Sequence, residues 1–267
     1  MRIGNNSDAI RNNLESNEKS QGRSMKRLSS GLGINSAADN AAGLSASETM
    51  RSQIRGDDMA QRNTADAAAM LAIADAGTET IGDSLQRMRE LALQASNGTY
   101  NDQQRAALQA EYGQLAEGIG QIAKGTNYNG TALLSNADGL SMQVGAGATG
   151  TSQVTLPAMD LSKLSKGIGN IGSQAMAMQS LASIDAALHQ VQGVRSQVGS
   201  SMNRLDKTYA NLQSMSANTA DAESRIRDAD MAAETTRRTR DQILEQSSLA
   251  MMAQSNKMDQ GMLSLLR

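Results

Sequence analysis

Few residues of this chain have the type and spacing that catalysis or cofactor binding requires. Residues 145–150, Gly-Ala-Gly-Ala-Thr-Gly, match the GxGxxG pattern of dinucleotide-binding loops. That loop needs a strand before it, a helix after it and an acidic residue about 20 positions further on. Here we predict a second strand after the glycines, so a hairpin turn explains them. His189 is the single histidine, and one histidine without cysteine or clustered carboxylates makes a poor metal site.

The other polar motifs are equally weak signals of chemistry. Asp57 and Asp58 are adjacent, and a helix points adjacent side chains in different directions. Two glycosylation sequons, 97–99 and 129–131, both contain Asn-Gly and also read as simple turns. The sequence contains no HExxH, GxSxG or GxxxxGK[ST] motif. We therefore expect a protein that is not an enzyme and that has no metal, no cofactor and no catalytic residue.

Composition points to thin helix–helix interfaces instead of a globular core. The chain has 17 Met and four Tyr but no Phe and no Trp, so Leu, Ile, Met and Ala must supply the buried surface. Cysteine is absent, which excludes disulfides and thiolate chemistry. The net charge of −2 predicts no attraction to nucleic acid or an acidic membrane surface. Neither a secretory h-region nor a membrane-length apolar segment is found, so these observations alone indicate a soluble protein and give no address.

The strongest pattern is an apolar series in steps of three and four in the last third of the chain. This spacing is typical of a coiled-coil seam, which stays buried only where a partner helix runs beside it. Arg195 interrupts the series, and Tyr209 continues it. The predicted rod seam consists of Leu181, Ile184, Leu188, Val191, Val198, Met202, Leu205 and Leu212.

The rest of the chain is predicted from periodicity, turn residues and caps. We expect helices at about 5–32, 44–96, 102–123 (N-capped by Asp102), 174–219 and 226–266. Between about 127 and 173, Gly, Ser, Thr and Val dominate, and alternation around 140–144 and 154–155 predicts a β-hairpin whose second strand Pro157 closes. The fold class is thus mainly α, a long antiparallel helical coiled-coil rod with a small β-hairpin region in the middle of the chain.

Both chain ends carry sparse apolar stripes. Isolated helices are marginal in water, so we expect the end helices to pair and to become fully ordered only on assembly. The residues predicted to pack there are Ile10, Leu14, Met25, Leu28, Leu244, Met251, Met258 and Leu265.

Several segments, in the right order, resemble the signatures of bacterial flagellin. At the N-terminal side these are Arg27–Leu32, Ile34–Asp39, Ala41–Leu44, Arg51–Gly56, Gln61–Asn63, Gln86–Ala92 and Asn97–Tyr100. At the C-terminal side they are Ala229–Ala232, Gln242–Leu244 and Leu263–Arg267. The resemblance covers residues 1–130 and about 175–267.

This resemblance implies a structural subunit that polymerises into the bacterial flagellar filament for swimming motility. Residues 1–43 and 226–267 would form the inner filament core, and 44–225, including a hairpin region at about 127–173, the rod domain without a large outer domain. It further implies type III export, an extracellular location, a homopolymer, and contacts with an export chaperone, the filament cap and hook-junction proteins. By position, recognition by the vertebrate Toll-like flagellin receptor would involve Arg87, Leu91 and Glu111.

Three other readings stay open. A hook–filament junction protein shares the end helices but usually carries a larger middle region. A secreted adhesin or immune-signalling ligand would polymerise only secondarily. A filament subunit with an embedded peptidase needs a metal motif that this sequence lacks.

Overall fold

The computed structural model describes residues 5–136, 138–147, 152–156 and 158–265. The chain divides into two compact units. Unit 1 comprises Met1–Ile54 and Ala217–Arg267, and unit 2 comprises Arg55–Ser216. The helices α2 (Ala41–Ala95) and α5 (Gln174–Arg227) contribute residues to both. The Gly-rich residues 148–150 and Pro157, which the sequence places at a hairpin, lie outside the described residues.

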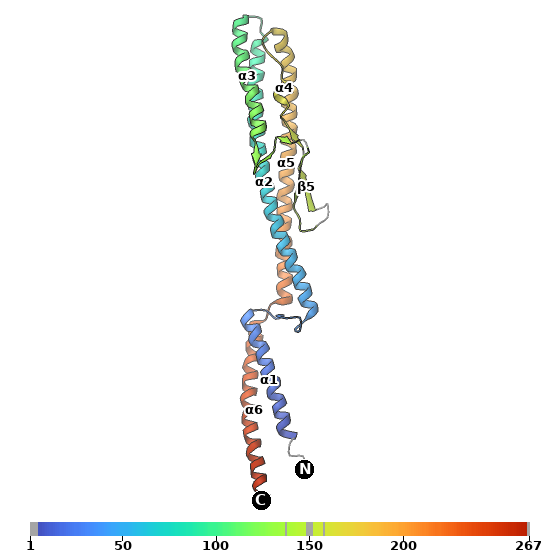
Figure 1. The fold of residues 1–267 in the computed structure, drawn as a ribbon, viewed down its shortest axis with the longest axis vertical. Coiled ribbons are helices and arrows are strands. Elements are labelled where there is room, and N and C mark those ends of the chain that lie inside the picture. Colours follow the sequence, from blue (N-terminus) through green and yellow to red (C-terminus); the bar gives the residue numbers. More distant parts are fainter. Residues whose placement is uncertain (1–4, 137, 148–151, 157, 266–267) are drawn as a thin grey trace. The chain divides into compact units, whose positions relative to one another are not determined.

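Unit 1 is built on a pair of helices from opposite ends of the chain. Helix α1 (Asn5–Ser30) lies alongside α6 (Met231–Leu265), blue against red in Figure 1. A short backbone bridge joins the segments that follow α1 and precede α6: Gly33 N–H donates to the carbonyl of Arg227 at 2.6 Å, and Ala229 N–H donates to that of Gly31 at 2.9 Å. Gly31 has φ +73°, a left-handed conformation that suits glycine just after a helix.

Unit 2 is organised around two long helices, α2 (Ala41–Ala95) and α5 (Gln174–Arg227). Ion pairs fix their direction, because Arg89 bonds Asp185 at 2.7 Å while Arg195 bonds Asp75 at 3.2 Å. The later residue of α2, Arg89, pairs with the earlier residue of α5, Asp185, so the two helices run antiparallel. At about 1.5 Å per residue, the 55 residues of α2 extend about 80 Å.

A third helix, α3 (Asp102–Gly125), covers part of this pair. Tyr112 is buried and its hydroxyl donates to the carbonyl of Ile168 at 2.8 Å, while burial raises the pKa of Tyr112 to about 12. The prediction that Asp102 caps α3 is wrong. Asn101 is the N-cap: its side chain accepts from Gln104 N–H at 2.9 Å, and the Gln104 side chain accepts from Asn101 N–H at 3.0 Å. This reciprocal capping box uses Asn101 and leaves Asp102 in the first turn.

The middle of the chain forms short antiparallel ladders and one helical turn on unit 2. Among the described residues, β4 pairs with β5 in the predicted hairpin, β1 pairs with β2, and β3 pairs with β6. Asn129 and Gly130 adopt φ 49° and 79° in the predicted turn between β1 and β2. These elements are β1 (Asn127–Tyr128), β2 (Thr131–Ala132), β3 (Ser135–Asn136), β4 (Leu140–Gln143), β5 (Gln153–Leu156), β6 (Met159–Asp160) and α4 (Leu164–Gly167).

The predicted fold class is confirmed, with one correction to the helices. The predicted interruption between residues 219 and 226 is wrong, because α5 continues to Arg227. The apolar stripe fades there, but alanine, glutamate and arginine are good helix formers and sustain the helix without it. The real break falls at residues 228–230, where Asp230 Oδ1 accepts from the N–H groups of Ala232 and Ala233, both at 3.0 Å, and starts α6 at Met231.

Candidate assembly surfaces

The interface between α1 and α6 contains a buried carboxylate in place of a dry apolar core. Glu234 on α6 is 4% exposed. It accepts a hydrogen bond from Ser24 at 2.9 Å and pairs with Arg27 at 3.0 Å, both on α1, and with Arg237 at 2.9 Å. Further along, Gln21 donates to Glu245 at 3.3 Å. These directional contacts favour one register of the two helices, since a shift of one turn would separate the buried Glu234 carboxylate from Ser24 and Arg27 and leave it only Arg237 of its own helix.

The electrostatics of Glu234 follow from these partners. Burial by itself raises the pKa of this carboxyl group. Hydrogen bonds from Ser24 and Arg27, together with the charges of Arg237 and Arg27, outweigh burial and hold the pKa of Glu234 below its ordinary value. Glu234 is therefore ionised at neutral pH and contributes to pairing in its charged form.

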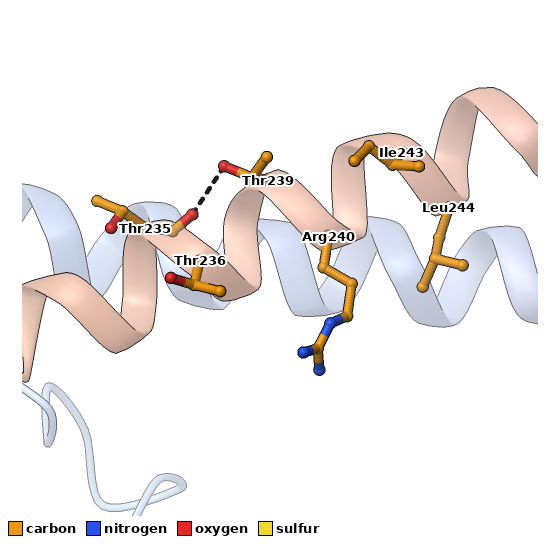
Figure 2. Close-up of a pocket in the computed structure, with 6 residues that line it drawn as sticks. All are labelled: Thr235, Thr236, Thr239, Arg240, Ile243 and Leu244. Carbon is orange, nitrogen blue, oxygen red and sulfur yellow. Dashed lines mark hydrogen bonds between the residues drawn. The ribbon is translucent and has the colours of Figure 1, made fainter.

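The outer face of α6 is apolar and open. Ile243, Leu244 and Leu249 are among its exposed large side chains. Figure 2 shows a shallow hollow on this helix, lined by a threonine cluster, Arg240, Ile243 and Leu244; Thr239 donates to the carbonyl of Thr235 at 2.9 Å. A second hollow on α1 includes Met25 and Lys26. Unit 1 thus presents apolar surface outward on both helices.

The terminal packing residues predicted from sequence fall into two groups. Ile10, Leu14 and Leu28 are half-buried on α1. The others are exposed in the single chain, at 50% for Met25, 44% for Leu244 and 59% for both Met251 and Met258. The side chain of Leu265 lies outside the described residues. No described residue of unit 1 covers the exposed group, so its predicted packing needs other partners.

In unit 2, the predicted rod seam of α5 faces the hydrophobic core. The fully buried members are Ile184, Val191, Val198, Leu205 and Leu212, and those half-buried against the same core are Leu181, Leu188 and Met202. Tyr209 is 41% exposed. Arg195 does not occupy the seam, because neighbouring Val194 is buried and Arg195 reaches outward to Asp75. Sequence reasoning missed the small buried residues Ala177, Ser180 and Ala187, whose spacing of three and four was the available signal.

Unit 2 buries one carboxyl group, that of Asp57, without a hydrogen-bond partner among the described residues. Asp57 on α2 is 0% exposed, and neither carboxylate oxygen has a hydrogen-bond partner among the described residues. Burial, and secondarily the charge of Asp58, raise the pKa of Asp57. Asp58 itself accepts from Ser216 of α5 at 3.4 Å, which places Asp57 near the end of the α2–α5 seam. A carboxylate in this position opposes tight pairing of the two helices when ionised.

The three residues suggested for receptor recognition are divided between surface and core. Arg87 donates to Glu111 of α3 at 3.0 and 2.8 Å and to Glu90 at 2.9 Å, and both Arg87 and Glu111 are exposed. Leu91 is 1% exposed and belongs to the core of unit 2. The structure therefore brings Arg87 and Glu111 together on the surface and holds Leu91 beneath.

The residues that the sequence singled out for metal or nucleotide binding lie apart in the structure. The described residues include no group of three His, Cys, Asp or Glu side chains that can hold a metal ion, and His189 is exposed on α5. In the described part of the Gly-rich motif, the Gln143 side chain donates to the carbonyls of Gly145 and Gly147, both at 2.7 Å. These hydrogen bonds hold the residues after β4 close to the end of that strand. No helix within the described ranges is both long and apolar enough to cross a membrane.

The paired end helices and the long antiparallel rod match two family models. The bacterial flagellin N-terminal helical region matches residues 4–139, and the bacterial flagellin C-terminal helical region matches residues 181–266. The chain belongs to the bacterial flagellin family. As such it is a structural subunit of the flagellar filament, as the sequence predicts.

Individual relatives are similar over most or all of the chain. The chain is 43% identical to a flagellin of Halalkalibacterium halodurans over 92% of this chain and 91% of that protein. It is 36% identical to a flagellin of Bacillus subtilis and 34% identical to the flagellar filament 31.3 kDa core protein of Treponema maltophilum, each over 100% of both chains. The crystal structure of Bacillus cereus flagellin aligns with a TM-score of 0.52 and 34% identity, covering 61% of this chain and 94% of that chain.

Proposed function

We propose that the subunit polymerises through the outward faces of α1 and α6, and that these helices become fully ordered only when neighbouring copies cover them. One observation carries the proposal. Among the described residues, every buried hydrophobic side chain except Ile34 belongs to unit 2. Unit 1 has two long helices, exposed Leu, Ile and Met side chains, and almost no apolar core of its own.

The energetics favour assembly over independent folding of unit 1. Burial of apolar surface contributes about 25 cal/mol per Å², and α1 and α6 bury little of it against each other. A long helix without a buried face gains little beyond its marginal intrinsic stability in water. Neighbouring copies that cover Ile243, Leu244 and Met251 supply the missing burial. Contacts that run head to tail without closing extend into a fibre.

Residues 1–43 and 226–267 are accordingly proposed as the inner filament core, and 44–225 as the rod domain around it. In this arrangement Met25, Leu244, Met251, Met258 and Leu265 pack against other subunits. Ile10, Leu14 and Leu28 pack within the pair. The role is structural and not catalytic.

The assignment is tested by seeded polymerisation. Purified subunit is mixed with short filament fragments and followed by electron microscopy. The full chain should extend the seeds into long tubes, and a variant that lacks residues 1–30 and 231–267 should remain soluble. Unit 2 of that variant should keep its helical circular dichroism, which separates loss of assembly from loss of folding. Native-looking fibres from the truncated variant would contradict the proposal.

The wider biology is proposed from family membership. We infer an extracellular location in the flagellum, reached by type III export as an unfolded chain, with an export chaperone bound around Met251–Leu266 and with the filament cap and hook-junction proteins as neighbours in the assembly. Recognition by the vertebrate Toll-like flagellin receptor is proposed at the exposed Arg87 and Glu111, with Leu91 supporting them from the core. Arg87→Ala should then weaken receptor activation, and unchanged activation would remove this proposal.

A further inference from the structure

Methionine is distributed unevenly between the surface and the interior of this protein. Among the described residues, it supplies eight of the fourteen exposed large hydrophobic side chains but only three of the thirty-two buried hydrophobic ones. The buried three are Met70, Met88 and Met159. The chain therefore uses Leu, Ile, Val and Ala for its permanent core and places thioethers where apolar surface meets solvent.

Four of the exposed methionines lie on the two helices of unit 1. Met25 is on α1, and Met231, Met251 and Met258 are on α6, each about half exposed or more. Unit 1 has no buried methionine among its described residues. These thioethers are open to solvent in the single chain, and they sit on the helices whose outer faces neighbouring copies are proposed to cover.

We propose that Met25, Met231, Met251 and Met258 are oxidation sites that control subunit addition: a hydroperoxide converts them to sulfoxides in the unassembled chain, and the modified chain no longer polymerises. This inference rests on the proposed function, because it takes the faces of α1 and α6 as contacts between copies. Assembly protects the same sulfurs by covering them.

Hydrogen peroxide oxidises a methionine thioether to a sulfoxide in one step. The thioether sulfur attacks one oxygen of hydrogen peroxide, an S–O bond forms, and the O–O bond breaks. The second oxygen leaves as water after proton transfer, so the sulfur is oxidised by two electrons and the peroxide is reduced. The chain has no cysteine, so no thiol of the same molecule competes for the oxidant.

Oxidation changes the property that assembly depends on. A thioether is apolar and flexible, and it fits irregular gaps between helices. A sulfoxide is polar and accepts hydrogen bonds, so an interface that buries it without a donor loses stability.

The first experiment treats the full chain with hydrogen peroxide before seeding. Peptide mass spectrometry should find sulfoxide at the four sites and little at Met70 and Met88. The critical concentration for growth should rise about tenfold or more, and methionine sulfoxide reductases should restore it. Peroxide-treated subunits that grow like untreated ones would overturn the inference. Untreated subunits that fail to grow would instead contradict the proposed function.

Matched variants locate the effect. One variant replaces Met25, Met231, Met251 and Met258 by leucine, and the control replaces the exposed unit 2 methionines Met59, Met176, Met178 and Met215. Met262, whose side chain lies outside the described residues, becomes leucine in both. The first variant should polymerise after peroxide treatment, and the control should stay sensitive. Resistance in the control alone would contradict the inference.

A measurement on the wild-type chain does not depend on the variants. Partly oxidised subunits are seeded, and the polymer is separated from the soluble remainder. Sulfoxide at each of the four sites should be several-fold depleted from the polymer, whereas sulfoxide at Met176 and Met178 should be equally represented in both fractions. Equal representation of all sites would overturn the inference.

Discussion

Unit 2 and unit 1 are both built from long antiparallel helices, but they bury different things between them. In unit 2 the seam is mainly apolar, with Leu71, Leu85, Ile184 and Val198 fully buried. In unit 1 the contact centres on Glu234 and its partners, and large apolar side chains such as Ile243, Leu244 and Met251 remain exposed. A seam of the first kind folds by itself. A contact of the second kind specifies register but leaves most of the hydrophobic stabilisation to neighbouring molecules.

The largest effect should come from a cavity in unit 2. Leu85→Ala removes a fully buried side chain and should lower the free energy of unfolding by about 2–5 kcal/mol, because the surrounding helices relax only partly. Leu244→Ala in unit 1 is the matched control. It should leave the thermal midpoint of the single chain almost unchanged and instead slow seeded growth. Equal destabilisation by the two changes would contradict the claim that unit 2 has a folded apolar core and that Leu244 of unit 1 contributes mainly to assembly.

The next effect concerns the buried carboxylate of unit 1. Glu234→Ala leaves Ser24 and Arg27 without their acceptor and should weaken the α1–α6 pair by about 1–3 kcal/mol. In the assembled filament, where α1 is expected to be protected, amide exchange in α1 should then become faster while exchange in unit 2 is unchanged. Glu245→Ala, at the edge of the same contact, is the control and should have a much smaller effect.

The pH dependence of the α1–α6 pair follows from the same residue. The pKa of Glu234 is lowered in the folded state, so its contribution is fully present above the unfolded pKa and is lost as pH falls through the lower folded pKa. In the filament, the protection of α1 amides relative to their intrinsic exchange rate at each pH should therefore fall in acid, below about pH 4.3. A Glu234→Gln variant should lack this acid-dependent step. An identical acid-dependent step in both proteins would assign it to another group.

Asp57 should give the opposite pH dependence in unit 2. Its pKa is raised in the folded state, so unit 2 loses stability as pH rises from the unfolded value of about 3.9 through the folded pKa. Asp57→Leu should be about 1–3 kcal/mol more stable than wild type at pH 7, because it removes an unpaired buried carboxylate. Denaturant unfolding at pH 7 and near pH 4 measures the difference. The exposed Asp66→Leu is the control, and equal effects of the two changes would contradict this account.

The smallest effect is expected at the surface of unit 2. Arg87→Ala removes ion pairs to Glu90 and Glu111, all with exposed side chains. Water and salt screen such pairs, so the thermal midpoint should stay within experimental error. A large drop would mean that surface charge, and not the buried apolar core, holds α2 and α3 together.

The sequence allowed prediction of the helices whose buried face is formed by large apolar residues. The Leu, Ile and Val positions of α5 and the turn at Asn129-Gly130 follow from periodicity and backbone preference. The small half of the seam, such as Ala177 and Ser180, was missed because alanine and serine occur on every face of these helices. The continuation of α5 to Arg227 was missed because a fading stripe was taken for a helix end.

The polar contacts were harder to predict because their partners are distant in sequence. Ser24 and Gln21 interrupt the stripe of α1, and only the fold shows that Glu234 and Glu245, more than two hundred residues later, receive their hydrogen bonds. Asp57 did carry a signal, since it precedes Ala60, Thr64 and Ala67 at seam spacing. The packing of Met25, Leu244, Met251 and Met258 between subunits stays a prediction.

The most direct test of the account is hydrogen exchange compared between the soluble subunit and the assembled filament. In the subunit, amides of α1 and α6 should exchange rapidly while those of α2 and α5 within unit 2 are protected. In the filament, α1 and α6 should become as protected as unit 2. Slow exchange of α1 and α6 in the isolated subunit, unchanged on assembly, would contradict the claim that neighbouring copies complete the fold of unit 1.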